Sequence, residues 1–222
     1  MPQPGEVTVQ PSAHAQSLAG VDLERADPPA LRVEAAGEVV IVVSRSRDAG
    51  REVFLERCAA DGVAVVRRPS GGGAVVLGPG VIAASVVAAS ADRSSFPDVW
   101  FRHFGDALAG ALAGLGVPEV TRQGVSDLCL GDRKIAGSSL RLAGGRVLYQ
   151  VSLLVDLDLA LLDRYLRVPS REPAYRRGRP HRDFVTTLRA EGFNLLPGRL
   201  LFAVHDALTG AAGALRARGA SV

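Results

Sequence analysis

The sequence predicts a single α+β domain with a mixed, largely antiparallel sheet flanked by helices. Three observations support this class. Short apolar segments recur along the chain and are separated by glycine-containing turns, as in strands joined by hairpins. Two longer segments, one in the middle and one at the C-terminus, carry apolar residues at helical spacing. The 222 residues are 47% hydrophobic, which is enough to form one sizeable core.

The N-terminal half is expected to consist mainly of strands. Residues 1–27 have few large apolar side chains and end at Asp27-Pro28-Pro29. We interpret residues 1–27 as an N-terminal lead-in that is either loosely ordered or contains one short helix around residues 13–23. The domain itself is expected to span residues 28–222. The elements expected next, in order, are strands over 31–43, a helix over 49–61, and strands over 63–66, 74–77 and 81–87.

The second half begins with the longer internal helix. Ser95-Phe96-Pro97-Asp98 is typical of a helix start, and the apolar residues from Val99 to Leu115 keep helical spacing until Gly116. The elements expected after it are strands over 127–130, 134–141 and 147–155, a helix over 157–166, a loop over 168–184, and an amphipathic helix over 197–218.

The composition excludes several classes of protein. The longest apolar run, over residues 74–90, is broken by Gly78-Pro79-Gly80, so we expect no membrane-spanning helix. No secretory leader is recognised, and two cysteines exclude a disulfide framework or a cysteine-rich zinc site, so the expected compartment is the cytoplasm. A net charge of +3 does not indicate a nucleic-acid partner. His14, His103 and His205 are isolated, with no second ligand at metal spacing, which predicts no metal site built by the protein.

A glycine-rich segment is the first candidate site. Arg67-Arg68 precede Pro69-Ser70-Gly71-Gly72-Gly73, and Ala74-Val75-Val76 lead into the next strand. Consecutive glycines let backbone N–H groups face a phosphate or carboxylate, and arginines add charge-assisted donors. A flexible hairpin turn with solvated arginines explains the same residues equally well. The segment matches neither the Walker loop nor the Rossmann fingerprint.

The second candidate segment contains the only lysine of the chain. Lys134 follows Gly131-Asp132-Arg133 and opens an apolar strand, with Gly137-Ser138 close behind. An ammonium group is a compact charge with three donors, which suits an α-phosphate or an acyl carbonyl. An ordinary surface lysine on a hairpin is the alternative. Because arginine fills every other basic position among the 26, a single lysine is less easily explained that way.

Together the two segments resemble the lipoate–protein ligase family, within the biotin/lipoate ligase and octanoyltransferase superfamily. The family patterns are R-R-x-S-G-G-G-A-V and D-L-x(n)-G-[DR]-[RK]-K-[IV]-x-G-S, and the chain contains both in the right order. The resemblance covers roughly residues 27–188. It includes the strand over 148–154 and the loop that precedes Val185-Thr186-Thr187-Leu188.

The resemblance implies a biotin/lipoate-ligase-like fold and an enzyme that acylates a lysine of a lipoyl carrier domain through an acyl-adenylate. It implies ATP with Mg²⁺, lipoate or octanoate as the acyl substrate, and no metal held by the protein alone. Lys134 would be catalytic, contacting the α-phosphate and the acyl carbonyl. The residues that would bind the nucleotide and the acyl group are Arg68, Ser70, Gly71, Gly72, Gly73, Ala74, Val75, Val76, Asp127, Gly137 and Ser138.

The chain departs from the family pattern near the site. Gln150-Val151 stands where the family has His-Gly, Ser126 replaces an asparagine, and Thr187 replaces the asparagine of V-T-N-L. The family's two-domain ligases also carry an accessory C-terminal domain, which is not expected within this chain. We therefore expect a separate accessory subunit as a partner beside the carrier domain.

The thioester route of the octanoyltransferases is not expected. Those enzymes use a cysteine, and one of their two cysteine positions holds Ser170 here, without a clear base to activate it. Cys58 and Cys129 lie in apolar segments and are expected to be buried.

Three alternatives remain open at this point. The chain could be a cysteine-independent octanoyl or lipoyl transferase, or a family member that binds lipoate or a carrier without catalysis. Biotin–protein ligase is disfavoured because its arginine- and glycine-rich loop is absent.

A basic segment would clamp a triphosphate, face an acidic acceptor, or simply be solvated. It contains Arg176, Arg177, Arg179, His181 and Arg182.

Overall fold

A computed structural model describes residues 9–90, 96–169 and 172–219 of the chain. None of the helices in these ranges is long and apolar enough to cross a membrane. In chain order the elements are α1 (Ala13–Leu18), η1 (Asp22–Arg25), β1 (Ala30–Ala35), β2 (Val40–Ser44), α2 (Ala49–Glu52), α3 (Leu55–Ala60), β3 (Ala64–Arg68), β4 (Val75–Leu77), β5 (Val81–Ala89), α4 (Pro97–Gly114), β6 (Val120–Gln123), β7 (Asp127–Leu130), β8 (Arg133–Ala143), β9 (Arg146–Leu154), α5 (Ala160–Tyr165), η2 (Ala174–Arg176), α6 (His181–Phe184) and α7 (Pro197–Gly219).

The strands divide between two sheets. The larger sheet has the order β1-β5-β9-β8-β7-β6 and is antiparallel throughout. The smaller sheet has the order β3-β2-β4, in which β2 and β3 run parallel and β2 and β4 antiparallel. The predicted mixed, largely antiparallel sheet flanked by helices is therefore confirmed, with its strands in two sheets.

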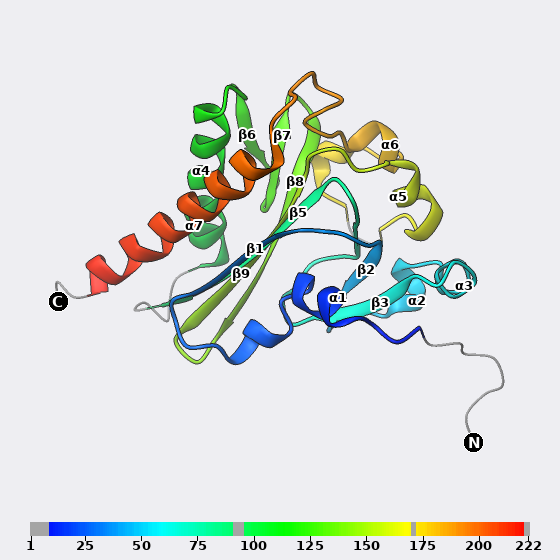
Figure 1. Ribbon diagram of the computed structural model, residues 1–222, viewed down its shortest axis with the longest axis horizontal. Helices are drawn as coiled ribbons and strands as arrows, with labels where there is room; N and C mark the ends of the chain where they lie inside the picture. The colour runs from blue at the N-terminus through cyan, green and yellow to red at the C-terminus, as the bar shows by residue number, and fades with distance from the viewer. Residues whose placement is uncertain (1–8, 91–95, 170–171, 220–222) are drawn as a thin grey trace.

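The larger sheet is covered on both faces. Helices α4 and α7 pack on one face, and the smaller sheet with the short helices lies on the other side (Figure 1). Along β5, Ile82, Ala84 and Val86 join the core under α4 and α7, whereas Val81 and Ala83 join the core towards the smaller sheet. Burial on both faces explains why β5 is apolar at every position except Ser85 rather than alternating.

The predicted helix over residues 49–61 is broken into α2 and α3. At the break, Val53 forms a β-bridge with Leu166, and the Phe54 N–H donates to the Tyr165 carbonyl oxygen at 2.9 Å. The guanidinium of Arg167 lies 4.2 Å from the centre of the Phe54 ring. These contacts with the end of α5 interrupt a segment whose apolar spacing alone is helical, so tertiary pairing overrides the local pattern.

Strand β6 was not predicted from the sequence. It lies at the edge of the larger sheet, pairs with β7, and presents Thr121, Arg122 and Gln123, none of which is buried. An edge strand of this kind has no apolar alternation to reveal it. The loop expected over 168–184 likewise contains the short helices η2 and α6, and α5 is shorter than the expected 157–166.

Two predicted helix starts are refined by the structure. Helix α4 begins at Pro97 with Phe96 at its N-cap, while Ser95 lies outside the described residues. In the lead-in, α1 occupies part of the expected 13–23 segment, with the Ser12 hydroxyl accepting from the Ala15 N–H at 2.9 Å. The α1 residue Leu18 is only 4% exposed and belongs to the core beside the smaller sheet.

Candidate active site

A cavity of about 240 Å³ lies between the two sheets. It brings together the two segments singled out in the sequence, which are about 60 residues apart in the chain. The predicted site residues that line it are Lys134, Arg68, Gly72, Gly73, Ala74, Val75, Val76, Asp127, Gly137 and Ser138. Ser70 and Gly71 are not among the lining residues.

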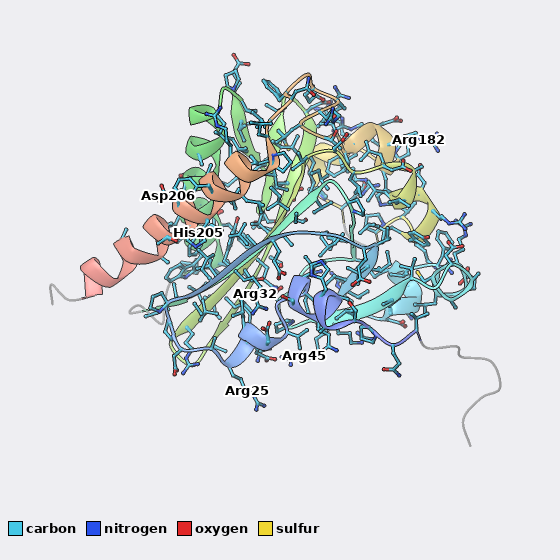
Figure 2. All side chains as sticks on the ribbon, viewed as in Figure 1. Arg25, Arg32, Arg45, Arg182, His205 and Asp206 are labelled. Atoms are coloured by element: carbon cyan, nitrogen blue, oxygen red, sulfur yellow. The ribbon has the colours of Figure 1, made fainter. Side chains whose placement is uncertain are left out.

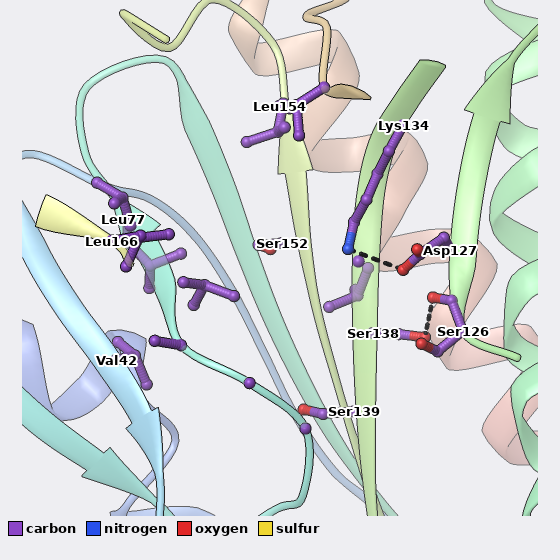
Figure 3. A pocket seen from close by; sticks show the side chains of 18 of the residues that line it. Val42, Leu77, Ser126, Asp127, Lys134, Ser138, Ser139, Ser152, Leu154 and Leu166 are labelled. Atoms are coloured by element: carbon purple, nitrogen blue, oxygen red, sulfur yellow. Dashed lines mark hydrogen bonds and ion pairs between the residues drawn. The ribbon is translucent and has the colours of Figure 1, made fainter. Parts of the chain in front are cut away.

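Lys134 is held inside the cavity wall by an ion pair. Its Nζ lies 2.8 Å from Oδ1 of Asp127 on the neighbouring strand β7, and the two side chains are 23% and 10% exposed (Figure 3). A register shift between Leu128 and Cys129 places Cys129 opposite Lys134. Lys134 is therefore a partly buried, paired cation in the cavity, and the alternative of a surface lysine is wrong.

Gly137 gives the lysine side chain its path. A Cβ added at Gly137 would lie 2.5 Å from the Nζ of Lys134 and 2.7 Å from its Cε. The lysine side chain thus passes over Gly137 of its own strand, where the absence of a Cβ leaves space for it. The spacing of lysine and glycine in the sequence motif has this steric reason: any side chain at Gly137 would displace the ammonium group.

Asp127 is also bound from the far side. The Tyr175 hydroxyl donates to Oδ2 of Asp127 at 2.7 Å, so both carboxylate oxygens have partners. Burial, together with the Asp127 charge, raises the pKa of Tyr175, which keeps its phenol as a proton donor. A Cβ added at Gly124, where φ is 58°, would lie 3.4 Å from Cε1 of the Tyr175 ring. Tyr175, in η2, therefore links the segment after α5 to β7, the strand whose Asp127 pairs with Lys134.

Arg68 braces the glycine-rich loop. It is 5% exposed, and its guanidinium donates to the carbonyl oxygens of Gly71, Gly73 and Val42 at 2.7–3.2 Å. Burial lowers its pKa to about 10, which the Glu52 charge opposes, so the group stays charged at neutral pH. The loop turns at Gly72, whose φ of 93° favours glycine. The alternative of a flexible turn with solvated arginines is wrong for Arg68.

Ser70 supports the loop from behind through a buried polar network. Its hydroxyl donates to Oε1 of Gln150 at 2.5 Å and lies 2.8 Å from the Ser139 hydroxyl. Nε2 of Gln150 donates to the Ala19 carbonyl oxygen at 2.8 Å and to the Ser85 hydroxyl at 3.0 Å. Gln150 thus joins the loop, the larger sheet and the end of α1.

Replacing Gln150 by leucine should loosen this junction. The substitution leaves the Ala19 carbonyl without a donor and the Ser70 hydroxyl without the Gln150 acceptor, so we expect a loss of about 1–3 kcal/mol in the free energy of unfolding. Urea denaturation measures it. The control is Gln123→Leu, which removes one exposed hydrogen bond to Gly131 and should cost less. Equal stability of Gln150→Leu and wild type would contradict the role of the network.

One side of the cavity is apolar. Val42, Leu77 and Leu166 lie across the cavity from the pair formed by Lys134 and Asp127 (Figure 3). Further apolar lining comes from Leu18, Ala83, Leu154, Leu162, Phe184 and Val185. The arrangement suits a ligand with an apolar chain and an anionic or carbonyl-bearing end.

The cysteines lie outside this arrangement. Cys58 and Cys129 are 1% and 0% exposed and are both free thiols, which confirms the prediction that they are core residues. Burial raises the pKa of Cys58 to about 11 and also raises that of Cys129. Neither lines the cavity, and Ser170 lies outside the described residues. Within the described ranges, no group of three or more histidine, cysteine or acidic side chains is arranged to hold a metal ion.

Several cavity residues were missed in the sequence. Leu18 and Ala19 come from the lead-in, and Glu52 from the broken helix; all three line the cavity. Leu18 and Ala19 lie in an N-terminal segment whose composition is poor in large apolar residues, which gives no signal of a site. Glu52 is 5% exposed, and a buried glutamate is recognisable only once the fold is known.

A comparison with known families places the chain. The model of the lipoyl protein ligase A/B catalytic domain matches residues 18–197. The chain belongs to this family. Among solved structures, a bipartite lipoate protein ligase from Thermoplasma acidophilum superposes with a TM-score of 0.75 at 24% identity, over 91% of this chain and 80% of the other. A lipoate–protein ligase A bound with ATP gives a TM-score of 0.71 at 24% identity, over 90% and 79%. The predicted fold is therefore confirmed.

Curated relatives of this family member carry two kinds of name. Lipoate–protein ligase 2 of Staphylococcus aureus is 29% identical over 62% of this chain and 39% of its own length. The lipoate–protein ligase of Streptococcus pyogenes is 32% identical over 52% and 33%. The octanoyltransferase LipM of Symbiobacterium thermophilum is 29% identical over 67% and 62%. The chain thus matches well under half the length of the first two relatives.

Proposed function

We propose that this protein is a lipoate–protein ligase-like enzyme that attaches a lipoyl or octanoyl group to a lysine of a separate lipoyl carrier domain through an acyl-adenylate. The observation that carries the proposal is the meeting of Lys134, the braced glycine-rich loop and an apolar wall in one cavity. Family membership and the ligases among the relatives support it.

The proposed chemistry assigns separate roles to the residues. The amine of the acceptor lysine attacks the acyl carbon, an amide bond forms, and the bond to AMP breaks. Charge develops on the carbonyl oxygen and the leaving phosphate, and the Lys134 ammonium would stabilise both. Asp127 and Gly137 position that ammonium, Arg68 and Ser70 position the loop, and Gly72 to Val76 would face the nucleotide and the acyl group.

ATP and lipoate are the proposed substrates, with octanoate as the alternative acyl group. One neighbouring structure in the family holds ATP, and a ligase from T. acidophilum holds lipoic acid. The carboxylates that line the cavity are Glu52 and Asp127; Asp127 is paired with Lys134, and Arg68 is close enough to Glu52 to feel its charge. We therefore propose that Mg²⁺ enters on the triphosphate rather than on a protein-built site.

The proposed partners are a lipoyl carrier domain and an accessory subunit. The acceptor lysine must lie in another protein, because Lys134 is the only lysine in the chain. The T. acidophilum ligase is described as bipartite and was studied with its E2 lipoyl domain, and a curated relative from the same organism is named subunit 1. We propose the cytoplasm as the compartment, since the two cysteines are free thiols.

The intact mass of a purified lipoyl domain tests the proposal. One tube contains this protein, ATP, Mg²⁺ and lipoate, and a second replaces ATP and lipoate with an octanoyl carrier protein. We expect a lipoyl-sized mass gain that requires ATP, with the accessory subunit added if the chain alone is slow. A mass gain only from the octanoyl carrier would favour the second candidate, a cysteine-independent transferase. The similarity to LipM supports this candidate. No gain in either tube would favour a binding protein.

A further inference from the structure

Arg176 is a buried cation with an unused donor. It lies in η2, is 4% exposed and lines the cavity. Its Nε donates to the Arg179 carbonyl oxygen at 2.9 Å and lies 3.5 Å from Oε2 of Glu172. Its Nη2 is buried and has no hydrogen-bond partner among the described residues. A buried, unpaired guanidinium N–H is costly, and an acceptor from a ligand bound in the cavity would satisfy it.

The charged groups around Arg176 have both signs: Glu172 and Asp163 are acidic, and Arg179 is basic. His181 lines the same cavity, and its pKa is lowered by burial first and then by the charge of Arg176, with Lys134 contributing as well. Asp163, at 3.6 Å from Nδ1 of His181, is the opposing carboxylate. The Arg176 guanidinium also lies 4.9 Å from the centre of the Phe184 ring, which holds it in place. Arg176 and Lys134 therefore act on one region of the cavity.

We propose that Arg176 binds a phosphate or pyrophosphate group of the acyl donor, in the part of the cavity next to Lys134. A planar guanidinium with a free Nη2 matches phosphate oxygens, and an anion there would satisfy the buried donor. The inference rests on the proposed function. The phosphate could belong to the β and γ positions of ATP, or to the phosphopantetheine arm of an acyl carrier.

Binding of inorganic pyrophosphate, measured by calorimetry, tests the subsite without turnover. The wild type is compared with Arg176→Gln and with the control Arg182→Gln. Arg182 lies in the neighbouring helix α6, and its side chain is 70% exposed and lies at the outer surface (Figure 2). We expect Arg176→Gln to weaken pyrophosphate binding about tenfold or more, because it removes at least one charge-assisted hydrogen bond. The control should bind pyrophosphate within about twofold of the wild type.

Thermal unfolding without ligand separates binding from folding. Because Arg176→Gln removes a buried charge with an unpaired donor, its melting temperature should not fall below that of the wild type by more than a few degrees. Arg176→Lys, which keeps the charge, covers the case in which glutamine disturbs the fold; it should bind pyrophosphate more weakly than the wild type while melting normally.

The source of the phosphate is resolved by two further titrations. Loss of ATP binding in Arg176→Gln, with AMP binding unchanged, assigns the subsite to the β and γ phosphates; loss of coenzyme A binding assigns it to the pantetheine phosphate. Absence of pyrophosphate binding in the wild type, or equal weakening in the Arg182 control, overturns the inference. Because these readouts need no acyl transfer, a mass gain on the lipoyl domain can still support the proposed function.

Discussion

Lys134→Met is expected to slow acyl transfer to the carrier by about 10²–10³-fold, the effect of removing one preorganised donor from a developing oxyanion. The ammonium lies in the cavity wall 2.8 Å from Asp127, and the other two cations of β8, Arg133 and Arg141, do not line the cavity. The readout is the single-turnover rate of mass gain on the lipoyl domain, started from preformed lipoyl-AMP. Starting from the adenylate isolates the transfer step from nucleotide binding.

Two further variants make this result interpretable. Methionine leaves the carboxylate of Asp127 without its cation, although the Tyr175 hydroxyl still donates to it, so some stability will be lost. Lys134→Arg keeps a charge but not the compact point charge, and should also be slow. The matched control is Arg133→Met, the neighbouring cation on β8, which pairs with Glu191 and does not line the cavity. Full transfer by Lys134→Met would rule out the proposed mechanism.

Gly137→Ala is expected to lower the transfer rate by about 10²-fold with little change in melting temperature. The added Cβ would lie 2.5 Å from the Nζ of Lys134, so the ammonium must move by roughly 1 Å, and a misplacement of that size costs about two orders of magnitude. The flexible end of the lysine side chain can move aside, and the backbone at Gly137 has no positive φ. The fold therefore tolerates the methyl group while the site does not.

The control for this variant is Gly110→Ala on α4. Nothing lies within 4 Å of a Cβ added at Gly110, and the residue is exposed on the helix. It should transfer at the wild-type rate and gain about 0.5–1 kcal/mol in stability from the better helix former. If Gly137→Ala transfers as fast as Gly110→Ala, the position of Lys134 does not control the rate.

Sequence patterns correctly predicted the elements whose buried and exposed residues alternate regularly along their whole length. Helix α7 was expected over 197–218 and spans Pro197–Gly219, because its apolar residues repeat on one face that packs on α4 and β5. They failed where a distant segment decides the conformation. The Val53 bridge to Leu166 splits one predicted helix in two, and β6 exists because β7 offers it a partner.

The residues of the candidate site likewise divide into those that the sequence pattern identified and those that only the structure identified. The lysine, the glycine three residues after it and the glycine-rich segment were recognisable by their order and spacing alone. The role of Arg68 was not recognisable from the sequence. An arginine beside three glycines suggests a contact with the ligand, whereas in the structure its guanidinium donates to the carbonyl oxygens of Gly71, Gly73 and Val42. Nor was the contact of Tyr175 with Asp127, which joins two segments 48 residues apart.

By itself, then, the sequence determined the fold class, the family, the two motifs and the burial of both cysteines, because these depend on local composition, periodicity and spacing. The tertiary structure decided which polar residues face the cavity and which ones only support it. Arg68 and Arg176 illustrate the reason. Arg68 ends β3 next to the glycine-rich loop, Arg176 lies in η2, and both are buried. The guanidinium of Arg68 donates to three backbone carbonyls, whereas Nη2 of Arg176 has no partner among the described residues. A buried donor takes its role from the acceptors that distant segments bring to it, and no local pattern specifies those.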